Sequence, residues 1–68
     1  MYYKLDLNVL NITMLSKGYS MNKLAEKSGV GKTTISRIFR EESIPRPETI
    51  FKIAKALEIN IEELIIKE

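Results

Sequence analysis

The sequence contains no histidine, no cysteine and no tryptophan, and it has only three glycines and two prolines among 68 residues. Without cysteine the chain can form neither a disulfide framework nor a thiolate metal site. Histidine is the other common zinc ligand and the usual general base near neutral pH, so its absence removes most of the remaining options. We therefore expect no metal, no cofactor and no catalytic activity, in a protein of the reducing cytoplasm.

The chain also lacks length and long apolar runs. A chain of this size buries only about 60% of the surface that its unfolded form exposes, which limits it to one modest core over residues 1–68. The segment from Met1 to Asp6 does not have the layout of a signal peptide, and no apolar run is long enough to span a membrane. These features predict one small soluble domain whose function lies on its surface, with no membrane partner.

Acidic residues are scarce in the first part of the chain and outnumber basic ones in the second. Residues 1–40 hold seven Lys or Arg and two acidic residues, a net charge of +5, whereas residues 41–68 hold four Lys or Arg and seven acidic residues, a net charge of −3. The overall +2 conceals this asymmetry. A cationic half indicates a surface directed at an anionic partner.

Helical periodicity dominates the sequence. Apolar residues recur at spacings of three and four, capping residues such as Asp6 and Ser20 precede these runs, and Gly18 and Gly29 follow them. No segment alternates with period two for long enough to predict a strand. The sequence thus predicts an all-α domain of five short helices, at about residues 7–17, 21–28, 32–40, 47–57 and 61–66.

The segment from Met21 to Arg40 has the layout of two helices joined by a tight turn at Gly29. Its apolar residues are expected to point inward; they are Leu24, Val30, Ile35 and Ile38. The outward face of its second helix then carries Lys32, Thr33, Ser36 and Arg37, with Arg40 at the end. Because no acidic residue lies between positions 32 and 40, this face can enter the major groove of DNA without charge repulsion.

These residues resemble those of a known family. The similar stretches are Leu24-Ala25, Gly29-Val30, Ile35 to Ile38, Pro45, Glu48 to Leu57 and Glu62 to Leu64. They are similar to the helix-turn-helix domain of the Cro and phage-repressor (XRE) family over about residues 10–65. The resemblance implies a five-helix, lambda-repressor-like fold in which the second and third helices form the motif and the third lies in the major groove.

Carried over position by position, the resemblance implies two sets of DNA contacts. The base-reading set is Lys32, Thr33, Ser36 and Arg37. Arg37 is the strongest single candidate, because arginine can donate two parallel hydrogen bonds to guanine. The phosphate-binding set, which fixes affinity and register rather than sequence, is Lys17, Ser20, Lys23, Thr34, Arg40 and Arg46.

The sequence departs from the family pattern at several helix ends. Met21 stands where many members have a glutamine that contacts DNA, and Gly31 stands where a serine commonly caps the third helix. Glu41 and Glu58 stand where glycine often closes the third and fourth helices. These differences affect helix ends more than the outward face of the third helix.

Two further patterns have ordinary explanations. The run from Gly31 to Thr34 is similar to the end of a phosphate-binding loop, but position 26 is Glu where that motif needs its first glycine, and no strand precedes it. We therefore do not expect ATP binding. Lys17, Lys23 and Lys27 could equally be a solvated surface.

Apolar residues near the ends of the chain exceed what one face of each helix can bury; they are Tyr2, Tyr3, Phe51, Ile65 and Ile66. One explanation is that they fill the core. The other is a twofold interface formed by the helix at 61–66, with Phe51, Ile65 and Ile66 in contact with a second copy. That homodimer would read two half-sites about one helical turn apart.

The sequence therefore predicts a sequence-specific DNA-binding transcriptional regulator that acts as a repressor and inserts its third helix into an inverted-repeat operator of double-stranded DNA. It would act as a homodimer, at least on DNA. The alternative is an antitoxin-like or protein-interaction module that has the same fold and weak DNA specificity.

Overall fold

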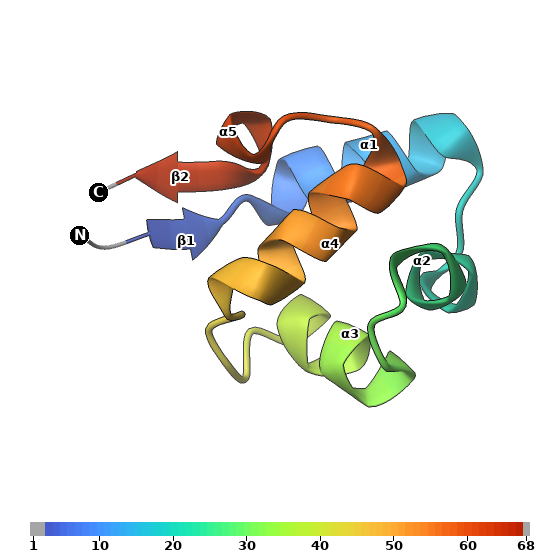
Figure 1. The fold of residues 1–68 in the computed structure, drawn as a ribbon, viewed down its shortest axis with the longest axis horizontal. Coiled ribbons are helices and arrows are strands. Elements are labelled where there is room, and N and C mark those ends of the chain that lie inside the picture. The colour runs from blue at the N-terminus through green and yellow to red at the C-terminus, as the bar shows by residue number, and fades with distance from the viewer. Residues whose placement is uncertain (1–2, 68) are drawn as a thin grey trace.

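Five helices and one pair of short strands make up the computed structural model, which describes residues 3–67 (Figure 1). The helices are α1 (Leu7–Lys17), α2 (Met21–Ser28), α3 (Lys32–Phe39), α4 (Pro47–Leu57) and α5 (Ile61–Leu64). The predicted helical architecture is confirmed, and each helix starts at the predicted residue. None of the helices within residues 3–67 combines the length and apolar character needed to cross a membrane.

Local capping explains why the helices begin where they do. A carboxylate oxygen of Asp6 accepts hydrogen bonds from the backbone amides of Asn8 and Val9, at 3.1 and 3.2 Å. Ser20 Oγ accepts from the amide of Lys23 at 3.1 Å. These acceptors satisfy amide groups that have no partner within the first turn of a helix. The starts of α1 and α2 are thus fixed by capping residues that lie next to them in the sequence.

The strand pair corrects the sequence prediction. β1 (Tyr3–Leu5) and β2 (Ile65–Lys67) are antiparallel, with Leu5 opposite Ile65 and Lys4 opposite Ile66. The prediction that no strand would form was wrong, and so was the extension of the last helix to residue 66. Three residues are too few to show an alternating pattern, and the pair exists only because the two ends of the described chain meet.

The core lies where α4 packs against α1, α2 and α5, with α3 packed on α2 (Figure 1). The side chains predicted to point inward from the helix-turn-helix segment are buried, as predicted; they are Leu24, Val30, Ile35 and Ile38. The other buried core residues are Leu5, Leu10, Met14, Ala25, Ile50, Ile53, Ala54, Leu57 and Leu64. In Figure 1, α3 runs along one side of this core and the strand pair lies at another.

Four residues that follow helices have left-handed backbone, and two of them are not glycine. Gly18 and Gly29 follow α1 and α2 with φ of +70° and +76°. Glu41 and Glu58 also adopt left-handed backbone, with φ of 57° and 60°. A residue with a side chain is strained there by roughly 1–2 kcal/mol, so these two positions require what glycine supplies more easily.

Candidate nucleic-acid interface

The outward face of α3 is built by the periodicity of the helix. Ile35 and Ile38 are three residues apart, only 1% and 3% exposed, and fasten α3 to the core. The helical repeat then turns the remaining side chains outward. Lys32, Thr33 and Arg37 are exposed and Ser36 is half-buried. The structure thus brings the four predicted base-reading residues onto one face of one helix.

This face is cationic, and its two cations are available. Lys32 and Arg37 form no ion pair with any residue between positions 3 and 67. No acidic residue interrupts the helix between them and Arg40. An arginine that is free of carboxylates can present its planar fork to a guanine edge or a phosphate. The face therefore carries the hydrogen-bond donors that DNA recognition needs.

The turn before α3 is set by Gly29 and Ser28. Gly29 has positive φ, and Ser28 Oγ accepts a hydrogen bond from the amide of Val30 at 3.2 Å. Val30 is buried beneath the turn. Gly31 begins α3 in extended conformation without a side-chain cap. The first amides of α3 therefore have no acceptor from their own cap, which suits a helix start that approaches an anion.

Ser20, a predicted phosphate contact, caps the start of α2. Its oxygen already accepts from the amide of Lys23, and its hydroxyl proton remains able to donate. Ser20 therefore caps the helix and can still contact a phosphate oxygen. Met21, where family members often carry a glutamine, is 41% exposed and offers no hydrogen bond from its side chain.

Three of the predicted phosphate-binding residues form an ion pair with a carboxylate, and these pairs were not predicted. An ion pair on the surface occupies the cation, so a phosphate that bound there would have to displace the carboxylate. For the exposed pairs of Lys23 and Arg40 this costs about 0–1 kcal/mol each. The pairs are Lys17 Nζ with Glu58 Oε1 at 3.0 Å, Lys23 Nζ with Glu26 Oε1 at 3.2 Å, and Arg40 Nε with Glu42 Oε2 at 3.6 Å.

Lys17 differs from the other phosphate candidates. It joins the end of α1 to Glu58, which follows α4, and its side chain is only 27% exposed. The hydrogen bond from Lys17 and its charge lower the pKa of Glu58, and the charge of Lys27 adds a smaller effect in the same direction. Arg46, in contrast, is an exposed residue at the opposite end of α4, about 16 Å away along an eleven-residue helix. Lys17 therefore links α1 to the end of α4, and it lies far from Arg46.

The two remaining phosphate candidates lie in the open. Thr34 and Arg46 are exposed, and Arg46 is in no ion pair among residues 3–67. Arg46 precedes α4, so it follows directly on the loop that leaves α3. Arg46 on the loop and Thr34 on α3 are therefore both free to contact a phosphate.

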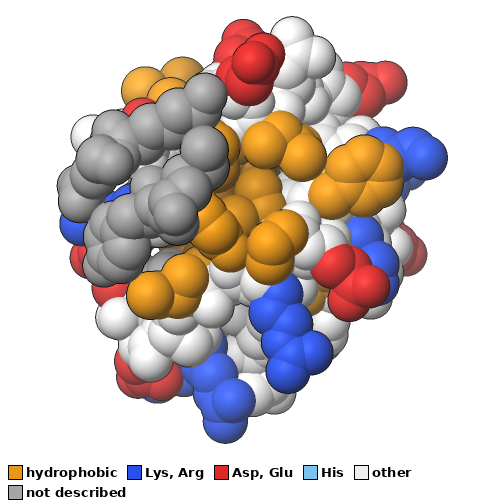
Figure 2. All heavy atoms as spheres, turned by 60° about the vertical axis from the view of Figure 1, so that its left-hand side comes forward, with side chains coloured by type: hydrophobic (Ala, Val, Ile, Leu, Met, Phe, Trp, Pro, Cys, Tyr) orange, Lys and Arg blue, Asp and Glu red, His pale blue; other side chains and the backbone are white. Residues whose placement is uncertain are grey.

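The residues predicted for a dimer interface lie away from α3. Phe51 on α4 is 53% exposed, Ile66 on β2 is 41% exposed, and Ile65 is partly buried against the core. Ile61 lines two neighbouring hollows, one with Phe51 and the other with Ile65, so the apolar surface is continuous. Figure 2, which turns the side of the strand pair forward, shows apolar side chains gathered on this face. Tyr2, which belonged to the same prediction, lies outside the described residues.

One exposed apolar surface was not predicted. Ile12 and Leu15 on α1 are 67% and 81% exposed. The signal was present, because residues 7–16 contain no charged side chain and a helix with apolar residues on every side is usually covered. The predicted apolar stripe of Leu10 and Met14, which do face the core, accounts for only one side of the helix.

Comparisons with known proteins agree with this geometry. A family model described as helix-turn-helix (HTH_3) matches residues 10–64. The HTH-type transcriptional regulator SutR of Escherichia coli (strain K12) is 42% identical over 43 residues, which are 63% of this chain. The match spans only 24% of that regulator's length. No solved structure gives a significant match.

Proposed function

The chain belongs to the XRE-type helix-turn-helix family of DNA-binding domains, and from this membership we propose that it is a sequence-specific transcriptional regulator. It acts as a repressor by placing α3 in the major groove of an operator. It works in the cytoplasm and has no catalytic role. The regulator of similar sequence supports the assignment to transcription.

One observation carries the proposal: α3 presents Lys32 and Arg37 on an exposed face that contains no acidic residue. An α-helix fits the major groove of B-form DNA, and bidentate arginine contacts distinguish guanine from the other bases. Thr33 and Ser36 add short hydroxyl groups that donate to or accept from base edges. The face thus combines electrostatic attraction with groups that can read a sequence.

The phosphate contacts divide into two kinds under this proposal. Arg46 and Thr34 bind phosphate directly, whereas Lys23 and Arg40 do so after exchanging a carboxylate for a phosphate. Both kinds release counterions from DNA, so binding weakens as salt rises. Lys17 contributes least, because its ammonium is held by Glu58.

The repressor binds as a homodimer through the apolar surface of Phe51, Ile61, Ile65 and Ile66. Figure 1 places the strand pair and α3 on different sides of α4, so a second copy seated at the strands leaves α3 uncovered. Twofold symmetry then makes the operator an inverted repeat, with half-sites about 34–36 Å apart.

Selection from a randomised pool of duplex DNA, at near-physiological salt, tests the function directly. The proposal expects enrichment of a consensus sequence, and an inverted repeat in it reports the dimer. Binding without enrichment, which merely fades as salt rises, would contradict sequence-specific regulation.

A protein-interaction module of antitoxin-like type is the second candidate, and the exposed Ile12 and Leu15 favour it. An uncharged apolar helix face has the composition found at the centre of protein interfaces. Under this alternative α1 holds a protein partner and α3 binds DNA with little specificity. The same selection experiment separates the two, because only the first function enriches a consensus.

A further inference from the structure

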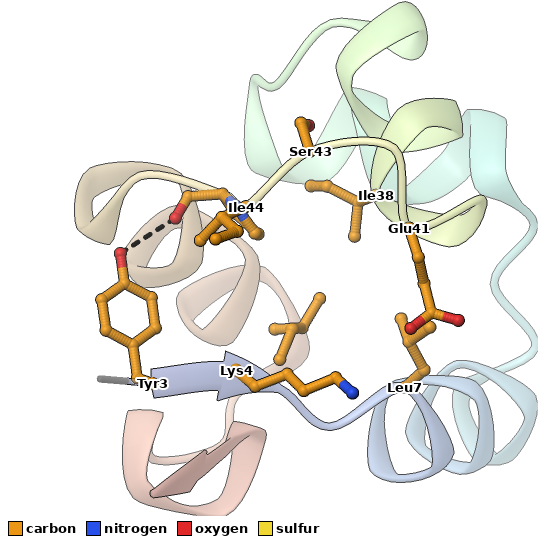
Figure 3. Close-up of a pocket in the computed structure, with 9 residues that line it drawn as sticks. Tyr3, Lys4, Leu7, Ile38, Glu41, Ser43 and Ile44 are labelled. Carbon is orange, nitrogen blue, oxygen red and sulfur yellow. Dashed lines mark hydrogen bonds between the residues drawn. The ribbon is translucent and has the colours of Figure 1, made fainter. Parts of the chain in front are cut away.

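A pocket of about 190 Å³ lies against the core-facing side of α3, near the end of that helix (Figure 3). Its walls come from β1, from the start of α1, and from the loop that joins α3 to α4. The apolar lining includes Leu5 and Ile38, which are buried in the core, and Ile44, which is 65% exposed at the mouth. No residue assigned to DNA contact lines this pocket.

A tertiary hydrogen bond holds the pocket in shape. Tyr3 Oη donates to the backbone carbonyl of Pro45 at 2.9 Å, and this bond joins β1 to the loop at one end of the pocket (Figure 3). The opposite wall is fixed because Ile38 belongs to the core. Walls that are fixed before a ligand arrives reduce the entropy cost of binding.

Two opposite charges lie at the other end of the pocket. The side chains of Lys4 and Glu41 both reach toward Leu7 in Figure 3. They do not form an ion pair with each other, since the pairs within residues 3–67 join other residues. The pocket therefore has one end with a separate cation and anion, and another end that is apolar.

We propose that this pocket binds a free α-amino acid with a branched or aromatic apolar side chain. The carboxylate of the ligand pairs with Lys4, its ammonium group pairs with Glu41, and its side chain packs between Leu5, Ile38 and Ile44. A dry cavity of about 150 Å³ is enough to hold benzene, so a side chain of that size fits. Most ligand pockets are about 300–1,000 Å³, so this one suits a small ligand.

Occupancy of the pocket would reach the DNA-binding helix through the backbone. The amide of Glu41 donates to the carbonyl of Ile38 at 3.1 Å, and the amide of Glu42 donates to the carbonyl of Arg37 at 3.0 Å. A ligand that holds Glu41 therefore also fixes the end of α3. Because ordering this end in advance lowers the cost of ordering it on DNA, the amino acid acts as a co-repressor. This second step rests on the proposed function.

Binding is tested on the full chain without DNA, by calorimetry and by following backbone amide signals in NMR titrations. The probes are leucine, 4-methylpentanoic acid, which lacks the ammonium group, and isopentylamine, which lacks the carboxylate. We expect leucine to shift the amides of the pocket and to bind at least about tenfold more tightly than either analogue. Equal affinity for all three, or shifts spread over the surface, would overturn the site.

Variants test the two charged contacts. Lys4→Gln and Glu41→Gln should each weaken leucine binding at least about tenfold. Lys52→Gln and Glu48→Gln are matched controls, because they remove the same charges from exposed positions on α4 outside the pocket. Equal affinity in all four variants would overturn the assignment of the contacts.

Coupling is then measured as DNA affinity with and without saturating leucine, by fluorescence anisotropy. We expect binding to tighten at least about fivefold, and Glu41→Gln to abolish the effect. Leucine that binds the pocket but leaves DNA affinity unchanged would overturn the coupling alone. Failure of the protein to bind any DNA would overturn the proposed function and leave the amino-acid site standing.

Discussion

At the scale of single residues, the proposed function assigns different roles to the cations on and around α3, some reading bases and others binding phosphates. Arg37 is exposed, unpaired within residues 3–67, and flanked by short hydroxyl side chains. Lys23 lies on α2 and is bound to Glu26 one turn further along the same helix. The two residues therefore should respond differently when their charge is removed.

We predict that Arg37→Ala lowers affinity for the selected operator by about 1–3 kcal/mol per contacted guanine and relaxes preference at one position of each half-site. Affinity for random DNA should change much less. Mobility-shift titrations on both kinds of DNA measure the difference. Arg37→Lys is the matched control, because it keeps the charge and removes the bidentate fork. Restoration of full specificity by lysine would contradict a bidentate contact.

We predict that Lys23→Ala weakens binding to every sequence about equally and reduces the salt slope by roughly 0.9. Glu26→Gln should act in the opposite direction, because it frees Lys23 from its partner without changing the shape of the side chain. Affinities measured over a series of salt concentrations give both slopes. A loss confined to the selected operator would show that Lys23 reads bases.

The ion pair between Lys17 and Glu58 should make stability depend on pH. The contact lowers the pKa of Glu58 in the folded state, so its stabilisation is present above the ordinary glutamate pKa and is lost as pH falls through the lowered value. We predict that Lys17→Gln raises the pKa of Glu58, as followed by NMR of its carboxyl carbon. Lys27→Gln should raise it less, because Lys27 is the weaker cause. An unchanged titration in Lys17→Gln would contradict the contact.

At the scale of structural elements, the turn between α2 and α3 depends on backbone conformation rather than on space. A Cβ atom added at Gly29 or at Gly31 would meet no atom within 4 Å. Only Gly29 has positive φ, whereas Gly31 is extended at the start of α3. The two glycines therefore form a matched pair in which only the conformation of the backbone differs.

We predict that Gly29→Ala lowers the free energy of unfolding by about 1–2 kcal/mol, because a side chain is strained in left-handed backbone. Gly31→Ala should change it by less than about 0.5 kcal/mol, since a slightly poorer cap is offset by a stiffer unfolded chain. Urea denaturation of the two variants measures the difference. Equal losses would mean that the turn is limited by packing instead.

At the scale of the whole molecule, two exposed apolar surfaces are candidate sites for a partner. One combines Phe51 with Ile65 and Ile66 beside the strand pair, and the other is the exposed side of α1 with Ile12 and Leu15. Both are unusual on a domain this small, because large apolar groups outside the core usually mark contacts. Only the first continues into the strand pair, which the sequence did not predict.

We predict that Phe51→Lys abolishes cooperative binding to an inverted repeat and leaves affinity for a single half-site nearly unchanged. Ile12→Lys is the matched control, because it places the same charge at an exposed position on α1. Sedimentation with and without operator DNA reports the stoichiometry. Loss of cooperativity in Ile12→Lys alone would move the interface to α1, and monomers on DNA in the unaltered protein would contradict the dimer.

The sequence by itself determined the five helix starts, the turn at Gly29 and the outward face of α3. These features depend on capping and on helical spacing, which involve residues no more than about four apart. They could be predicted without knowing how the chain packs. The resemblance to the family, rather than local spacing, marked Glu41 and Glu58 as residues standing where glycine is common, and both have positive φ.

Only the tertiary structure decided which distant segments meet. The pairing of β1 with β2, the contact of Lys17 with Glu58 and the bond from Tyr3 to Pro45 each join residues about 40 or more positions apart. The exposure of Ile12 and Leu15 depends in the same way on which side of α1 the core occupies. Local sequence patterns cannot predict such pairings. They form only when helices distant in sequence, such as α4 and its neighbours, pack together.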